Sequence, residues 1–119
     1  MGEAGVFPKS DRSGYGASMS PYFDPLLRIW FDEGGVFAIA NIRGGGEFGE
    51  KWHQDGILLK KQNTFDDFFA CMRYLVKSGH TTEERLAIEG GSNGGLLMGA
   101  MITQHPQAVQ AVVSHVGIY

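Results

Sequence analysis

The stretch Gly90-Gly91-Ser92-Asn93-Gly94-Gly95 decides the fold of this chain. A short apolar run at 86–88 precedes it and a helix-forming run at 96–104 follows it, which is the order strand, tight turn, helix. The stretch contains the pattern G-x-S-x-G, in which a serine lies on a sharp turn between a strand and a helix. Small neighbours are needed there because a Cβ atom would collide with the adjacent main chain. The sequence therefore predicts a nucleophile elbow with Ser92 at its corner.

The pattern alone is weak evidence, because a glycine-rich turn with a purely structural role can also contain it. The strand and the helix on its two sides supply the context that the motif requires, and they favour the elbow. Such a turn exposes the hydroxyl of Ser92, and the first N–H groups of the following helix face a developing negative charge. The N–H of Asn93, the residue after the serine, is an expected oxyanion donor.

The other apolar runs predict alternating helices and strands, which is typical of a parallel α/β sheet. Strands are expected at 36–42, 85–89 and 111–116, where short apolar runs are bounded by turn residues. Helices are expected at 24–33, with well-covered side chains, from Asn63 or Thr64 to Lys77, and at 93–104. The loop at 43–49 follows the first strand, so we expect it at the same sheet edge as Ser92.

Length and composition limit the class of protein. A chain of 119 residues fits one domain, and a net charge of −3 gives no basic face for nucleic acid. No run of 18 apolar residues predicts a membrane span. One cysteine, Cys71, permits no intrachain disulfide, which favours a reducing, cytoplasmic compartment, and its apolar helical neighbours predict a core thiol.

Carboxylates and histidines show no pattern of a metal site or cofactor site. No set of His, Cys, Asp and Glu has the spacing of metal ligands, so neither a metal nor a cofactor is expected. Asp66 and Asp67 fall in the expected first turn of the helix that ends at Lys77. We interpret them as a complement to the helix dipole on a solvated face, in preference to a paired acid and base.

Two stretches resemble the prolyl oligopeptidase family. One is Asn41-Ile42-Arg43-Gly44-Gly45-Gly46-Glu47-Phe48-Gly49-Glu50, followed by Trp52-His53 and by 62–68, and the other is 90–97. The resemblance covers about residues 15–119 and implies a partial α/β-hydrolase domain with parallel strands and flanking helices. Residues 1–14 do not match and are expected to be a poorly ordered lead-in.

The resemblance implies a function and roles for three residues. Members of the family are serine peptidases in which a β-propeller caps the hydrolase domain and admits short peptides, which are cleaved after proline. By resemblance Ser92 is the nucleophile and Asn93 an oxyanion donor. Asn93 and Tyr15 also fall where the family lines the pocket for the proline side chain. The expected partners are therefore short proline-containing peptides.

The sequence departs from the family in its catalytic groups. The catalytic Asp and His of the family follow the serine, and no residue up to Tyr119 matches them. The four histidines present do not suit the role of the base: His53, His80, His105 and His115. The second oxyanion donor of the family, a tyrosine in a Tyr-Gly-Tyr-Gly stretch, aligns with Arg12, although another register would assign it to Tyr15.

The strand that leads into that tyrosine stretch is expected to be missing, because 5–10 is a poor replacement. Its loss would remove the middle of the sheet and leave two buried edges unpaired, which is an aggregation hazard. We therefore expect part of a serine peptidase that lacks the propeller and the rest of the catalytic domain, and that is inactive alone. The alternatives are a non-catalytic chain that self-associates through open edges, as in a segment-exchanged homodimer, and another α/β-hydrolase such as an esterase, which 41–46 disfavour.

Overall fold

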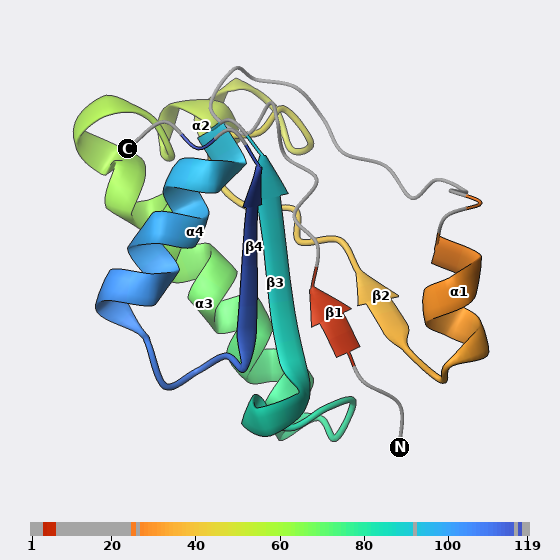
Figure 1. The fold of residues 1–119 in the computed structure, drawn as a ribbon. Helices are drawn as coiled ribbons and strands as arrows, with labels where there is room; N and C mark the ends of the chain where they lie inside the picture. Colours follow the sequence, from red (N-terminus) through yellow and green to blue (C-terminus); the bar gives the residue numbers. More distant parts are fainter. Residues whose placement is uncertain (1–3, 7–24, 26, 92, 116, 118–119) are drawn as a thin grey trace.

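A computed structural model of the chain describes residues 4–6, 25, 27–91, 93–115 and 117 (Figure 1). Tyr15 and Ser92 lie outside these residues. The described strands are Ala4–Val6 (β1), Val36–Ala38 (β2), Leu86–Gly91 (β3) and Ala111–His115 (β4). The helices are Leu27–Asp32 (α1), Glu50–Gln54 (α2), Lys61–Lys77 (α3) and Asn93–Gln104 (α4), with 3-10 turns at Leu58–Lys60 (η1) and Glu83–Arg85 (η2).

The four strands form one parallel sheet in the order β2-β1-β3-β4. Their carboxyl ends point the same way, toward the top of Figure 1. Helices α3 and α4 lie side by side and cover one face of β3 and β4. The predicted α/β class, with parallel strands and flanking helices, is confirmed.

The prediction that the middle strand is missing is wrong. Ala4–Val6, inside the stretch expected to be a lead-in, pairs with β2 on one side and with β3 on the other. Strand pairing uses backbone N–H and C=O groups, so a segment with little side-chain likeness to the family can still fill the gap. The inner edge of β2 is therefore paired, as is that of β3 over Leu86–Ile88, so the gap expected in the middle of the sheet is filled there. Within the described residues, β2 and β4 each have one neighbouring strand.

The core lies between the sheet and its helical layer. Side chains recur every three or four residues along α3, and Phe68 and Met72 are fully buried. They pack in one cluster with residues of β3 and α4: Leu86, Ile88, Leu97, Met98 and Met101. The amphipathic stripe predicted for this helix is confirmed, and it fixes α3 against α4.

Three elements differ from their predictions. Helix α1 has no buried residue, and Ile29 and Phe31 are 73% and 48% exposed, because α1 lies beyond β2, away from α3 and α4 (Figure 1). Strand β2 ends at Ala38, where its pairing with the three-residue β1 ends, and not at 42. Helix α3 begins at Lys61, earlier than the predicted cap at Asn63 or Thr64.

Candidate active site

The predicted strand, turn and helix are present around the serine. Strand β3 ends at Gly91 and helix α4 begins at Asn93, so a single position separates the two elements. That position is Ser92, which itself lies outside the described residues. The change from strand to helix therefore occurs over one residue, as a nucleophile elbow requires.

Two glycines allow helix α4 to lie very close to neighbouring main chain. A Cβ atom on Gly90 would lie 2.4 Å from the carbonyl oxygen of Gly94, and one on Gly95 would lie 2.5 Å from the Cα of Gly117. Real Cβ atoms do not approach other atoms so closely. The glycine-rich composition of the turn thus has a steric reason, which agrees with the prediction from the motif.

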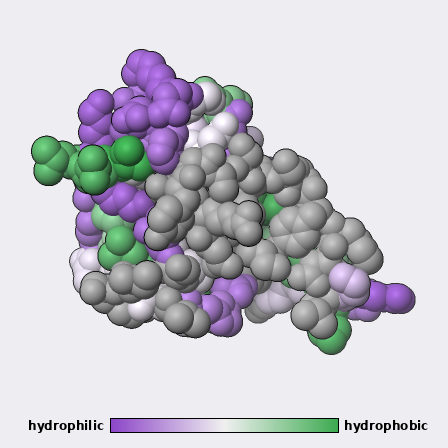
Figure 2. All heavy atoms as spheres, turned by 90° about the horizontal axis from the view of Figure 1, so that it is seen from above, coloured by the Kyte–Doolittle hydropathy of each residue, from purple (hydrophilic) through white to green (hydrophobic). Residues whose placement is uncertain are grey.

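Asn93 is the first residue of a twelve-residue helix, and it is half-buried. Backbone N–H groups in the first turn of a helix have no acceptor within the helix, and the helix dipole places partial positive charge at that end. The start of α4 is therefore a favourable place for a negatively charged oxygen. Figure 2 looks down on the carboxyl ends of the strands and shows hydrophilic side chains gathered over one part of this face.

The glycine loop at 43–49 is anchored to α3 by an ion pair. The guanidinium of Arg43 donates to both carboxylate oxygens of Asp67, at 2.9 and 2.7 Å, and the backbone N–H of Arg43 donates to the same carboxylate at 2.9 Å. The interpretation of Asp67 as a dipole complement is wrong, because α3 begins at Lys61 and Asp67 lies beyond its first turn. Asp66 is exposed and accepts a hydrogen bond from Gln62.

Further hydrogen bonds hold the same loop. The buried hydroxyl of Thr64 lies 2.6 Å from the carbonyl oxygen of Arg43 and 3.0 Å from that of Gly56. The Nδ1 of His53 donates to the carbonyl oxygen of Gly44 at 2.7 Å. The side chains of α3 near its start thus hold loops in place, and Thr64 makes no capping bond. Sequence reasoning missed this network, because its partners are distant along the chain.

The four histidines lie in four different environments. His53 is bound to the glycine loop, and His80 lies 2.8 Å from the hydroxyl of Ser78 after α3. His105 stacks on the ring of Phe69, with centroids 3.5 Å apart and planes at 2°. His115 is paired in register with Gly91 on the neighbouring strand, which places its backbone beside the turn.

The side chain of His115 is engaged by a carboxylate. Its Nε2 lies 2.7 Å from an Oε1 of Glu89. Gly90 faces α4, and strand side chains alternate, so Glu89 and Gly91 face the other side of the sheet. The pair therefore ties β3 to β4 on the face that α4 does not cover. Sequence reasoning missed it, since no local spacing links two residues that meet only through strand register.

Cys71 is partly buried and packs against the core, as predicted. Burial, and then the nearby charge of Asp67, raise the pKa of its thiol. Across the described residues no three His, Cys, Asp or Glu side chains converge on a common point. Among the described helices none has the length and apolar character needed to span a membrane.

Comparison with known proteins places this site in a known context. The sequence model of the prolyl oligopeptidase family matches residues 21–119. The prolyl endopeptidase of Elizabethkingia meningoseptica is 45% identical over 105 residues, which are 88% of this chain and 15% of that protein. The prolyl endopeptidase of Dictyostelium discoideum is 54% identical over 84 residues, which are 71% of this chain and 11% of that protein.

Solved structures agree with this match. A structure from an analysis of two prolyl endopeptidases aligns with a TM-score of 0.92 and 47% identity, over 98% of this chain and 17% of that one. A post-proline cleaving enzyme from Rickettsia typhi aligns with a TM-score of 0.92 and 40% identity, over 98% and 17%. The chain spans 11–15% of the two curated relatives described above.

Proposed function

Because the chain belongs to the prolyl oligopeptidase family, we propose that it carries the nucleophile of a serine peptidase that cleaves short peptides after proline. The observation that supports this most directly is the joint between β3 and α4. One residue, Ser92, separates β3 from α4, and the two elements pack main chain to main chain at Gly90 and Gly94. This is the local geometry that a reactive serine needs.

The proposal assigns a role to each of three residues. The hydroxyl oxygen of Ser92 attacks the carbonyl carbon of a proline residue in the peptide. The backbone N–H of Asn93 donates a hydrogen bond to the oxyanion that forms, since the start of α4 favours negative charge. Asn93 and Tyr15 line the pocket for the proline ring. The family match supports the assignments of Ser92 and Asn93, because it covers residues 21–119. Tyr15 lies outside that range, so its assignment rests on the resemblance alone.

We also propose that the 119-residue chain does not turn over peptides alone. A serine hydroxyl is a weak nucleophile at neutral pH unless a base removes its proton. Each of the four histidines is already engaged, and His115, which is the one paired in register with the turn, has its side chain on Glu89. Loss of triad members lowers kcat by roughly 10⁴–10⁶-fold. The base and its carboxylate partner would come from parts of the longer relatives that this chain does not match, as would a propeller.

A chimeric enzyme tests the peptidase assignment. The matching segment of a full-length prolyl endopeptidase is replaced by residues 21–119, and release of p-nitroaniline from a glycyl-proline anilide is measured. We expect turnover, and we expect Ser92→Ala to abolish it. A folded chimera that keeps its activity with Ser92→Ala would exclude Ser92 as the nucleophile.

The 119-residue chain itself provides the test of inactivity. We expect its rate on the same anilide to equal that of the Ser92→Ala chain, and we expect no labelling of Ser92 by a fluorophosphonate probe in a mass spectrum. A rate that Ser92→Ala removes would show that a base is available within these residues.

A second candidate function is self-association, and it is favoured by the position of β2, which has one neighbouring strand among the described residues. A groove of about 390 Å³ runs between residues 38–40 and the side of α3 that carries Cys71 and Leu75, and its lining is almost entirely apolar. An edge strand beside an apolar groove can pair with another copy of itself. Light scattering after size exclusion decides: a defined dimer that Ala38→Lys dissociates supports it, and a monomer excludes it.

A further inference from the structure

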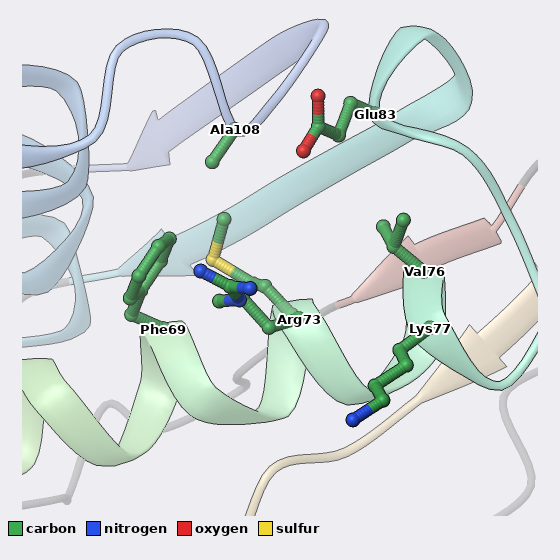
Figure 3. A pocket seen from close by; sticks show the side chains of 7 residues that line it. Phe69, Arg73, Val76, Lys77, Glu83 and Ala108 are labelled. Atoms are coloured by element: carbon green, nitrogen blue, oxygen red, sulfur yellow. The ribbon is translucent and has the colours of Figure 1, made fainter.

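A cavity of about 220 Å³ lies between α3, η2 and the loop that joins α4 to β4 (Figure 3). Its lining comes from the C-terminal half of α3, from η2 and from the loop between α4 and β4. Met72, which is 1% exposed, forms the apolar floor, and the half-buried side chains of Phe69, Val76 and Ala108 form the walls. The cavity thus has a small apolar floor with partly apolar walls.

Charges of both signs stand around this apolar floor. Arg73 and Lys77 lie one turn apart on α3, and Glu83 comes from η2 on the other side of the cavity (Figure 3). Within the described residues, no carboxylate lies within ion-pair distance of Arg73 or Lys77, and Glu83 makes no ion pair. Arg73 and Glu83 thus bring charges of opposite sign to the cavity, whereas the ammonium of Lys77 points away from Glu83 (Figure 3).

The arginine is held near the cavity by an aromatic stack. The guanidinium carbon of Arg73 lies 5.8 Å from the centroid of the Phe69 ring, within range of a cation–π contact. The imidazole of His105 stacks on the same ring. Phe69 is thus fixed by a partner from outside α3, and it limits the positions that the guanidinium can take. A fixed guanidinium is well suited to bind a carboxylate.

We infer that this cavity binds a small zwitterion with an apolar side chain, that is, an apolar α-amino acid or a dipeptide of such residues. The ligand carboxylate would pair with Arg73, its ammonium with Glu83, and its side chain would cover Met72 and Val76. The volume lies below the range of about 300–1,000 Å³ that is typical of larger ligands, which limits the occupant to this size. A neighbouring hollow that shares Phe69, Glu83 and Ala108 gives room for the second residue of a dipeptide.

The site does not depend on the proposed peptidase function. Glu83 lies before the start of β3, and the six residues of that strand span roughly 20 Å up to its end at Gly91. Ligand binding at the cavity can therefore be measured whether or not the serine is reactive.

The test is a titration of the ¹⁵N-labelled 119-residue chain with L-leucine, monitored through the amide signals in its NMR spectrum. We expect saturable shifts for residues 69–77 and Glu83, with a Kd on the order of 1 mM. N-acetyl-L-leucine lacks the ammonium and L-leucinamide lacks the carboxylate, and each should bind at least about tenfold more weakly, a loss of one charge-assisted contact. Shifts that do not saturate, or equal binding of all three compounds, would overturn the inference.

Variants of the protein test the same two charged contacts from the side of the binding site. Glu83→Gln and Arg73→Gln should each weaken leucine binding about tenfold, and Arg28→Gln, an exposed control outside the cavity, should leave it unchanged. If Arg28→Gln weakens binding as much as Arg73→Gln, the attraction is unspecific and the inference fails. The ligand analogues decide the same question without any substitution, so a variant that folds poorly does not block the test.

Discussion

Arg43 and Asp67 lie 24 positions apart in the sequence and are joined by three hydrogen bonds of 2.7–2.9 Å. Two of them come from the guanidinium, and the third comes from the backbone N–H of Arg43. Both side chains are largely shielded, at 33% and 22% exposed. The hydrogen bond to Asp67 raises the pKa of Arg43 above its ordinary value. One carboxylate thus fixes both the side chain and the main chain where the glycine loop begins.

Substitution of Asp67 should therefore destabilise the chain more than substitution of its neighbour. Asp67→Asn removes the charge that three donors share, and we expect a loss of about 2 kcal/mol in the free energy of unfolding. Asp66→Asn is the matched control, because Asp66 is exposed and accepts one bond from Gln62, and it should stay within about 0.5 kcal/mol. Urea unfolding followed by circular dichroism measures both. Equal losses would mean that the ion pair does not anchor the loop.

A second prediction concerns the buried hydroxyl of Thr64. Its Oγ1 serves two carbonyl oxygens, those of Arg43 and Gly56, and the residue has no exposed surface. Thr64→Val keeps the shape and leaves both oxygens without this donor, so we expect a loss of about 1–3 kcal/mol in urea unfolding. Thr103→Val is the control, since the hydroxyl of Thr103 is on an exposed part of α4 and bonds within its own helix. A loss in the control as large as that in Thr64→Val would contradict the role of the buried hydroxyl.

Local patterns predicted the elements that local sequence determines. Helix α4 has the predicted bounds of 93–104, because a glycine turn fixes its start and His105-Pro106 its end. The apolar stripe of α3 is confirmed, since its period is a property of the helix itself. The strand before the elbow was also predicted, with a shift of its bounds to Leu86–Gly91.

Contacts between distant segments could not be predicted in the same way. The pairing of Ala4–Val6 depends on two neighbouring strands and on backbone groups that all residues share, so its side chains carry little signal. The partner of Asp67 is an arginine in a loop, and that of Glu89 is a histidine on another strand. The sequence pattern assigns Asp67 a role within its own helix, because helix periodicity carries no information about a partner 24 residues away.

The thiol of Cys71 gives a prediction about pH. Burial raises its pKa above the ordinary value of 9.0, so the unfolded chain loses the thiol proton first as the pH rises. The unfolded state then binds fewer protons than the folded one, and the free energy of unfolding falls. Below pH 9.0 the thiol does not lower the free energy of unfolding. As the pH rises from 9.0 to the higher pKa of the folded state, the free energy of unfolding decreases.

Cys71→Ala isolates this effect from the other groups that titrate in the same range. Urea unfolding is measured at about pH 8 and about pH 10. We expect a larger decrease between the two for the original chain than for Cys71→Ala. At neutral pH the folded chain should also react more slowly with a thiol reagent than the urea-unfolded chain. Equal decreases with pH in the two chains would show that Cys71 ionises as freely when folded as when unfolded.

The last prediction tests the packing on which the elbow depends. A methyl group on Gly90 would meet the carbonyl oxygen of Gly94 at 2.4 Å, and neither main-chain segment can move without shifting β3 or α4. We expect Gly90→Ala to cost about 3 kcal/mol in urea unfolding. Gly79→Asn is the control: this glycine follows α3 in open space with a φ of 82°, which asparagine tolerates, so a loss under about 1 kcal/mol is expected. If Gly90→Ala proves as mild as the control, strand and helix are not in main-chain contact, and the geometric support for a nucleophile at Ser92 is lost.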